Sequence, residues 1–190
     1  MTIGVLGLQG DFREHLHILE RLGIDGRDVR NPEALEGVEG LIIPGGESTT
    51  LARLLVSSGL FPLIRQRGRQ GWPLFGTCAG MILLAKGVSP GLERSLELID
   101  IDVARNAYGR QIESFEAELE VKSIGRMQAI FIRAPQVTRV GPEVQVLATY
   151  RNSTVIARQG NVLVASFHPE LSGETRVHEY FARMIVERAH

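Results

Sequence analysis

Cysteine occurs once in this sequence, in the segment Gly76-Thr77-Cys78-Ala79-Gly80. The segment lies between an apolar run that predicts a strand and an apolar run that predicts a helix. The spacing Gly-x-nucleophile-x-Gly is typical of a nucleophile elbow, which points the reactive atom over the carboxyl end of a sheet. The N-terminus of the following helix favours a thiolate, and the Ala79 N–H is placed to donate to an oxyanion. The alternative is a buried cysteine at a tight turn.

A thiolate nucleophile needs a base that is itself held in place. The segment His168-Pro169-Glu170 follows an apolar strand-like run. Proline favours an extended backbone before it, and residues two apart in an extended segment project to the same side. We therefore expect Glu170 to hold one imidazole nitrogen while the other faces Cys78. The alternative is a surface turn with a solvated glutamate. The remaining histidines, at positions 15, 17, 178 and 190, are interpreted as ordinary polar positions.

A glycine turn is the third candidate. Pro44-Gly45-Gly46-Glu47-Ser48-Thr49-Thr50 ends a buried strand-like run at 41–43. A phosphate cradle is a weak interpretation, because the Gly-Lys-Ser/Thr ending of a P-loop is absent. A second oxyanion donor, at Gly46, explains the turn better, because a glycine pair lets a backbone N–H face a ligand.

Composition narrows the class of protein. The 190 residues carry a formal net charge of −1, which gives no electrostatic footprint for nucleic acid or an anionic membrane. No apolar run approaches the roughly 20 residues that span a bilayer. One cysteine allows neither an internal disulfide nor a Cys-x-x-Cys metal site. We expect one domain over residues 1–190, in the cytoplasm, without metal or organic cofactor.

Alternating strands and helices must position these groups. The first 90 residues contain three strand-turn-helix units, which predict an α/β fold with a mostly parallel central sheet flanked by helices. Helices are expected at 12–22, 61–69, 81–85 and 174–188. A further helix is expected after the glycine turn, with Ser48 or Thr49 as its N-cap. The second half adds strands at 98–103, 117–121, 129–132, 144–148, 154–157 and 162–167. A short connection at 88–92 is interpreted as a variable loop.

These motifs, in this order, resemble the class I, triad-type glutamine amidotransferases. Over nearly the whole chain the sequence is similar to the family of glutaminase subunits of pyridoxal 5′-phosphate synthase. The similar segments are Gly7-Leu8-Gln9-Gly10-Asp11, 44–50, 75–81, Arg105-Asn106-Ala107-Tyr108-Gly109-Arg110-Gln111, Ser114-Phe115-Glu116, Phe131-Ile132-Arg133-Ala134-Pro135 and 166–171.

The resemblance implies a flavodoxin-like fold with an added antiparallel strand region, and a single glutamine amidotransferase domain. It implies Cys78 as nucleophile and His168 with Glu170 as its relay. It also implies that L-glutamine is bound by Gly46, Glu47, Ser48, Arg105, Ile132 and Arg133. Free glutamine carries a carboxylate and an ammonium group, so a site with cations, an acid and backbone donors suits it.

The implied partner is the barrel-shaped synthase subunit, which would take up the ammonia and build pyridoxal 5′-phosphate. Two alternatives remain open at this point. One is the glutaminase of another amidotransferase, such as imidazole glycerol phosphate synthase. The other is a non-enzymatic sensor that uses Cys78 as a redox group on the same scaffold.

Overall fold

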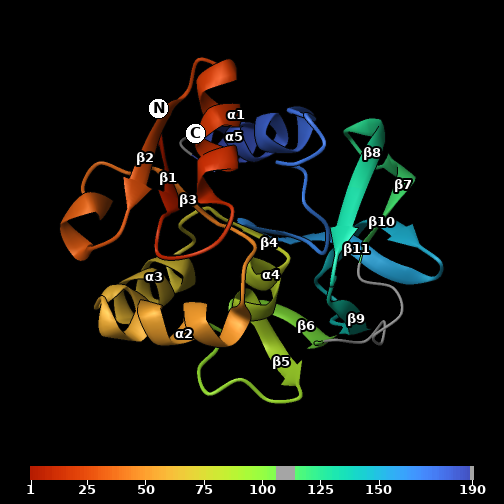
Figure 1. The fold of residues 1–190 in the computed structure, drawn as a ribbon, viewed down its shortest axis with the longest axis horizontal. Coiled ribbons are helices and arrows are strands. Elements are labelled where there is room, and N and C mark those ends of the chain that lie inside the picture. Colours follow the sequence, from red (N-terminus) through yellow and green to blue (C-terminus); the bar gives the residue numbers. More distant parts are fainter. Residues whose placement is uncertain (106–113, 189–190) are drawn as a thin grey trace.

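A seven-stranded sheet forms the centre of the molecule (Figure 1). The computed structural model describes residues 1–105 and 114–188. The strand order is β10-β11-β12-β4-β3-β1-β2. The parallel strands are β1 (Thr2–Leu6), β2 (Asp25–Val29), β3 (Gly40–Ile43), β4 (Leu74–Thr77) and β12 (Val162–Ala165). Two antiparallel strands, β11 (Ser153–Gln159) and β10 (Gln145–Tyr150), extend one edge. The mostly parallel α/β sheet predicted from the sequence is confirmed.

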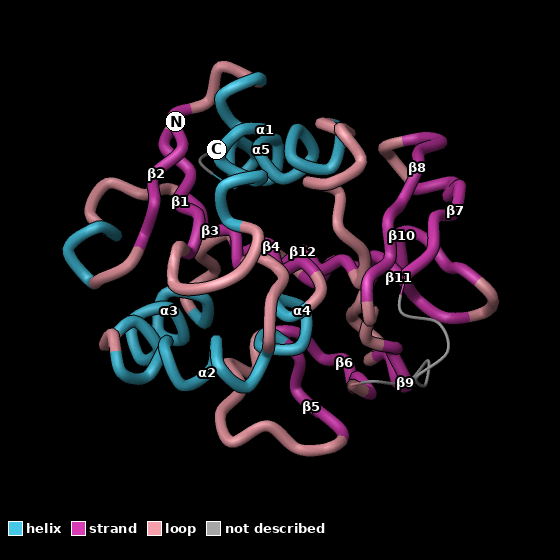
Figure 2. Tube along the Cα trace, in the orientation of Figure 1, coloured by secondary structure: helices cyan, strands magenta, loops and turns pink. Residues whose placement is uncertain are grey.

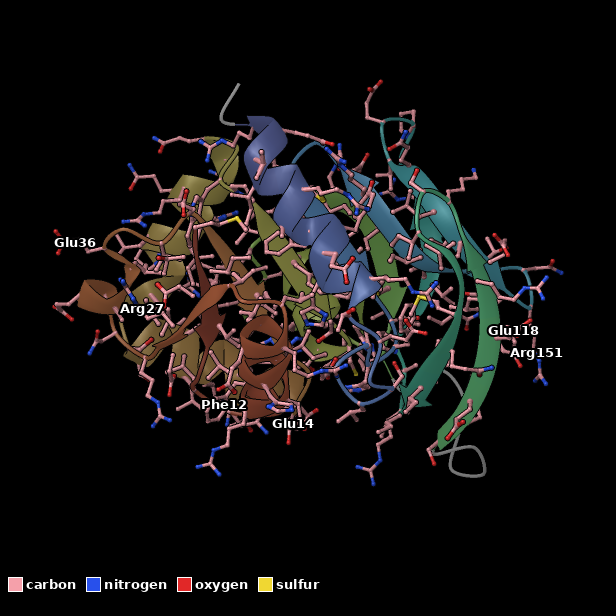
Figure 3. The ribbon with its side chains drawn as sticks, turned by 90° about the horizontal axis from the view of Figure 1, so that it is seen from above. Phe12, Glu14, Arg27, Glu36, Glu118 and Arg151 are labelled. Carbon is pink, nitrogen blue, oxygen red and sulfur yellow. The ribbon has the colours of Figure 1, made fainter. Side chains whose placement is uncertain are left out.

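Helices cover both faces of this sheet (Figures 1 and 2). On one face lie α1 (Phe12–Arg21) and α5 (Arg176–Arg188), and Figure 3 shows α5 running across the sheet. On the other lie α2 (Ser48–Ser57), α3 (Leu60–Arg69) and α4 (Ala79–Leu84). A short 3-10 helix, Pro32–Leu35, follows β2. Among the described residues, no helix is both long and apolar enough to cross a bilayer.

Each face of the sheet has its own hydrophobic core, because successive strand residues point to opposite sides. In β3, Leu41 and Ile43 belong to the core under α2, α3 and α4, whereas Ile42 belongs to the core under α1 and α5. All three side chains are 0 % exposed. A strand buried on both faces reads as a continuous apolar run, which is why β3 was identifiable in the sequence.

The added strand region consists of two smaller sheets beside the main one. One pairs β5 (Ala85–Ser89) with β6 (Ile99–Ala104) in parallel and β6 with β9 (Gln136–Val140) in antiparallel orientation. The other is a hairpin of β7 (Ser114–Val121) and β8 (Gly125–Ile132). Phe115 and Phe131 stack across this hairpin with ring centroids 4.6 Å apart. The hairpin ends at Ile132, close to the carboxyl edge of the main sheet.

Three strands were not expected from the sequence: β2, β5 and β9. β2 tolerates the polar sequence Asp-Gly-Arg-Asp-Val because it forms an edge of the sheet, where β1 is its one partner strand among the described residues. The interpretation of residues 88–92 as a variable loop was partly wrong, since β5 continues to Ser89 and pairs with β6. Pairing with a distant partner makes these short segments strands, and local sequence carries little of that signal.

Candidate active site

Cys78 lies at the sharp turn between β4 and α4, as the elbow pattern predicts. Its backbone angles are φ 48° and ψ −104°, a region that non-glycine residues rarely adopt. The Cys78 N–H donates to the Ala165 carbonyl at 2.8 Å, which ties the turn to β12. A Cβ atom at Gly80 would lie 2.0 Å from the Ile43 carbonyl oxygen. The glycine therefore allows the turn to press against β3 and holds the cysteine at the carboxyl edge of the sheet.

His168 and Glu170 meet on the neighbouring turn, which follows β12. His168 Nδ1 lies 2.6 Å from Glu170 Oε1, and both side chains are buried. The expected extended backbone was wrong: the Leu171 N–H donates to the His168 carbonyl at 3.2 Å, which closes a turn. The two side chains meet because the turn brings them together. A further hydrogen bond, from the His168 N–H to the Ile130 carbonyl, fixes the turn to β8 at 2.8 Å.

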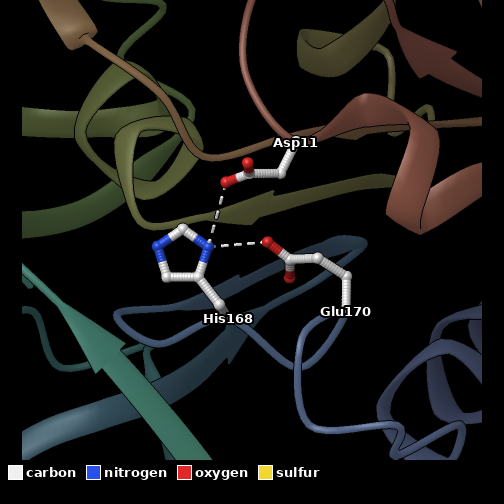
Figure 4. Close-up of side chains that lie close together, drawn as sticks. All are labelled: Asp11, His168 and Glu170. Carbon is white, nitrogen blue, oxygen red and sulfur yellow. Dashed lines mark hydrogen bonds and ion pairs between the residues drawn. The ribbon is translucent and has the colours of Figure 1, made fainter. Parts of the chain in front are cut away.

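The electrostatics of His168 favour its charged form. Burial has the largest single effect on the pKa of His168, and it lowers this pKa. The hydrogen bonds and the charges of Cys78 and Glu170 together outweigh burial and raise the pKa to about 10. Burial raises the pKa of Glu170, and the hydrogen bond and charge of His168 oppose that rise. Since His168 Nδ1 bonds to Glu170, Nε2 is the ring nitrogen left to act on Cys78 and substrate. Figure 4 shows that this second ring nitrogen points away from the carboxylates.

Asp11 is a member of this site that the sequence analysis did not assign. Its Oδ2 lies 3.4 Å from His168 Nδ1, the same ring nitrogen that Glu170 contacts (Figure 4). Asp11 precedes α1, but its side chain makes no capping hydrogen bond to that helix. Burial raises its pKa, the charge of His168 lowers it and that of Glu14 raises it. Its place just after β1, at the same sheet edge as Cys78, was the available signal.

The same three side chains, Asp11, His168 and Glu170, offer ligand atoms within 4.8 Å of one another. Two carboxylates and one imidazole are donors that a divalent cation accepts. However, His168 Nδ1 already lies 2.6 Å from Glu170 Oε1, so an ion would have to break this pair. The geometry fits a hydrogen-bonded acid–base group better than a metal centre.

A cavity of about 540 Å³ opens over the cysteine. Every residue that the resemblance assigned to glutamine lines it, as do two of the three triad residues and Asp11. Ala79 does not line it, since its side chain is only 1 % exposed at the start of α4. The lining residues are Asp11, Gly46, Glu47, Ser48, Cys78, Ile82, Arg105, Ser114, Ile132, Arg133, His168 and Leu171.

The comparisons with known proteins agree with this geometry. The family model described as "SNO glutamine amidotransferase family" matches residues 5–187. The chain belongs to this family. It is 57 % identical to a protein of Thermosipho africanus named pyridoxal 5′-phosphate synthase subunit PdxT, over 97 % of this chain and 99 % of that one. A protein of the same name from Fervidobacterium nodosum is 54 % identical over 98 % of each chain. A solved structure titled as a glutamine amidotransferase, 49 % identical, superposes with a TM-score of 0.93 over 96 % of this chain and 98 % of that one.

The glycine turn of this amidotransferase is held by Gln9. A Cβ atom at Gly46 would lie 2.4 Å from Gln9 Oε1, and the Glu47 N–H donates to the same oxygen at 2.9 Å. A Cβ atom at Gly45 would lie 2.4 Å from the His168 ring. The glycine pair therefore allows close approach of both Gln9 and the histidine.

Glu47 has a structural task besides lining the cavity. Its carboxylate accepts from the N–H groups of Thr49 at 3.0 Å and Thr50 at 2.7 Å, so Glu47 caps α2. The expected cap, Ser48 or Thr49, was wrong, because α2 begins one residue earlier than that reading requires. The hydrogen bond from the Thr50 hydroxyl has the largest effect on the pKa of Glu47, and it lowers this pKa. Together with the backbone donors it outweighs burial and lowers the pKa of Glu47 to about 2.

Arg105 joins two walls of the cavity. Its Nη1 donates to the hydroxyls of Ser48 at 3.2 Å and Thr49 at 3.0 Å, while Nε and Nη2 donate to the carbonyls of Pro90 and Gly91. The guanidinium thus holds the start of α2 against the loop after β5. Residues 106–111, the rest of the segment that carried the family resemblance, lie outside the described residues.

Ile132 contributes its backbone to the site. The Cys78 thiol donates to the Ile132 carbonyl at 3.7 Å. The next residue, Arg133, has φ 45°, so the chain turns sharply after β8. This turn keeps a carbonyl next to the sulfur and places an arginine on the cavity wall.

The interpretation of the other histidines as ordinary polar positions was wrong for two of them. His15 and His178 are each 0 % exposed. His15 Nδ1 lies 2.8 Å from His178 Nε2. His17 fits the interpretation, with a side chain 68 % exposed, and His190 lies outside the described residues. The available signal was position on the helix: His15 follows Phe12 by three residues and precedes Leu19 by four, so it shares their buried face.

Proposed function

We propose that this chain hydrolyses L-glutamine to L-glutamate and ammonia and supplies the ammonia to a pyridoxal 5′-phosphate synthase subunit. The observation that carries the proposal is that His168, hydrogen-bonded to the buried Glu170, lines the same cavity as Cys78 and the residues assigned to glutamine. Family membership and the names of the full-length relatives support the same reaction.

In the first half of the proposed reaction, Cys78 Sγ attacks the carbon of the glutamine side-chain amide. The attacking form of the sulfur is the thiolate, and His168 carries the proton that the leaving nitrogen needs. The amide oxygen gains negative charge, and backbone N–H groups at Gly46 and Ala79 stabilise it. His168 gives its Nε2 proton to the nitrogen as the carbon–nitrogen bond breaks. Ammonia leaves, and the glutamyl group stays on sulfur as a thioester.

In the second half, water attacks the thioester carbon. His168 Nε2 accepts a proton from this water, and the carbon–sulfur bond breaks to release glutamate. Glu170 keeps the proton of His168 on Nδ1 throughout, so that Nε2 is always the nitrogen that exchanges protons with substrate. The cavity walls at Glu47, Ser48, Arg105 and Arg133 bind the charged amino-acid end of glutamine.

Ammonia released to solvent would be lost, so a partner must receive it. We propose the barrel-shaped synthase subunit for this role, in the cytoplasm, where a free cysteine stays reduced. We further propose that turnover is low until that subunit docks. The basis is the glycine turn: Gln9 holds it through the Glu47 N–H, next to the Gly46 donor, so a docked subunit that moves Gln9 would reset this turn.

The test is ammonia release from glutamine by the wild type and by Cys78→Ala, each with and without synthase subunit. We expect ammonia only from the wild type, at a higher rate with synthase. Activity that survives in Cys78→Ala would reject the assignment of the nucleophile. Equal wild-type turnover with and without synthase would reject the activation, but not the hydrolysis.

A glutamine-like electrophile separates the enzyme from a redox sensor. It should label Cys78 of the wild type, and glutamine should protect against labelling, because both compounds would occupy the same cavity. Labelling that glutamine does not slow would support a reactive cysteine without a glutamine site. Pairing the chain with the synthase of a different amidotransferase is the control for the choice of partner.

A further inference from the structure

Two histidines that the proposed steps do not use lie in the core behind Glu170. His15 on α1 and His178 on α5 are fully buried, and His15 Nδ1 lies 2.8 Å from His178 Nε2. Their ring centroids are 5.0 Å apart. A buried imidazole is stable only where its nitrogens find partners, so their contacts indicate what holds them there.

The other nitrogen of His15 faces the active site. His15 Nε2 lies 3.4 Å from Glu170 Oε2 and 3.3 Å from the hydroxyl oxygen of Thr77, the residue before Cys78. Glu170 Oε1 is bonded to His168, but Oε2 is a buried oxygen without a hydrogen-bond partner among the described residues. His15 is therefore placed beside the half of the carboxylate that His168 leaves unsatisfied, and beside the nucleophile turn.

The contacts favour one tautomer of the histidine pair. With the His15 proton on Nε2, an N–H faces the carboxylate, and Nδ1 accepts a hydrogen bond from His178 Nε2. His178 Nδ1, which is buried without a partner in the described part of the chain, is then a bare lone pair. The opposite tautomer would turn a lone pair toward the carboxylate and leave an N–H of His178 buried and unsatisfied. An unsatisfied donor and two facing lone pairs are both costly.

We propose that His15 is a positioning residue for glutamine hydrolysis, with its proton on Nε2 shared between Glu170 and Thr77. The donor holds the Glu170 carboxylate ionised and at a fixed angle to the His168 ring, and it ties that carboxylate to the turn that carries Cys78. His178 sets the tautomer of His15. The inference rests on the proposed function, because it assigns His15 a role through Glu170.

The titratable groups around His15 come from two other elements: His178 from α5, and His168 and Glu170 from the turn after β12, where Asp11 contacts His168. Burial, with the charges of His178 and His168, lowers the pKa of His15 well below 6.5, and burial lowers that of His178 to about 3. Both rings stay neutral near pH 7. His15 thus places a neutral N–H beside Glu170 without a competing positive charge, which remains on His168.

The test compares His15→Leu, which removes the donor and keeps an apolar volume, with His15→Gln, which supplies an amide N–H. His17→Gln, on the exposed face of the same helix, is the matched control. With synthase present, kcat of His15→Leu should fall about 10- to 100-fold, as expected for a lost hydrogen bond to a charged group. KM should change little, because His15 does not line the cavity. His15→Gln should recover most of the loss.

The pH profile separates positioning from simple packing. Without its donor Glu170 is harder to ionise, so the acid limb of the kcat profile should move up by about one pH unit in His15→Leu and return in His15→Gln. An acid limb that stays in place in both variants overturns the proposal, whatever the loss of rate. A wild-type chain without glutaminase activity would instead reject the proposed function.

A second measurement needs neither activity nor a variant that folds. Two-bond proton–nitrogen spectra of the 15N-labelled wild type distinguish protonated from bare ring nitrogens. We expect His15 to carry its proton on Nε2 and His178 to carry its own on Nε2. A proton on His15 Nδ1 would overturn the proposal, because no donor would then face Glu170.

Discussion

Glu170→Gln replaces a buried carboxylate with an amide of nearly the same shape and removes the negative charge beside His168. The pKa of His168 is about 10, compared with an ordinary value of 6.5. At about 1.4 kcal/mol per pKa unit, this elevation corresponds to roughly 5 kcal/mol of added stability for the imidazolium. Glu170 and Cys78 each contribute a hydrogen bond and a charge, so we assign about half of it, ~2.5 kcal/mol, to Glu170.

Such a loss predicts a fall in kcat/KM of about 50- to 100-fold, because each 1.4 kcal/mol is a factor of about ten. The pKa of His168 should drop, so the alkaline limb of the kcat/KM profile should move from near pH 10 toward about pH 8. The assay is ammonia release with synthase present, over pH 6 to 10.5. Glu187→Gln is the control, because its side chain is 65 % exposed on α5, at the surface.

The rate of Cys78 alkylation by iodoacetamide gives an independent readout, since the reagent reacts with the thiolate. In Glu170→Gln, alkylation near pH 9 should slow, because His168 is neutral there in the variant but still charged in the wild type. The reasoning would be refuted by a variant whose alkaline limb and alkylation rate both match the wild type. It would also be refuted by equal losses in Glu170→Gln and Glu187→Gln.

Three further outcomes are expected. Gly80→Ala places a Cβ atom 2.0 Å from the Ile43 carbonyl and should cost about 1–3 kcal/mol or more in unfolding free energy, measured by urea titration; an unchanged midpoint would contradict the close approach. Arg105→Lys loses the forked contact to Ser48 and the loop carbonyls, so KM for glutamine should rise about 10-fold with kcat nearly unchanged; equal KM values would place the guanidinium outside the binding role. His168 has a folded pKa near 10 and an unfolded value of 6.5, so its charge stabilises the fold fully below about pH 6.5 and progressively less up to pH 10. The destabilisation by His168→Ala, from urea midpoints, should therefore be larger at pH 6 than at pH 10, and a pH-independent difference would contradict it.

Local sequence was sufficient for the parts of this protein that obey local rules. The elbow around Cys78 was recognisable because only small residues fit where Gly80 presses on β3. Buried parallel strands such as β3 were recognisable because both of their faces are apolar. The order of the three motifs, with the helices between them, was enough to predict that they meet at one edge of a parallel sheet.

Contacts between distant segments decided the rest. β2 and β5 are strands because their partners pair with them, although their own residues are polar or ambiguous. Asp11 belongs to the site only because the loop after β1 reaches the turn after β12, where Asp11 Oδ2 lies 3.4 Å from His168 Nδ1. His15 looked like a surface residue, and its meaning depends on Glu170, 155 positions further along the chain, and on His178. Periodicity can place a histidine on the buried face of a helix, but only the packing of α1 and α5 against the sheet decides which atoms that histidine meets.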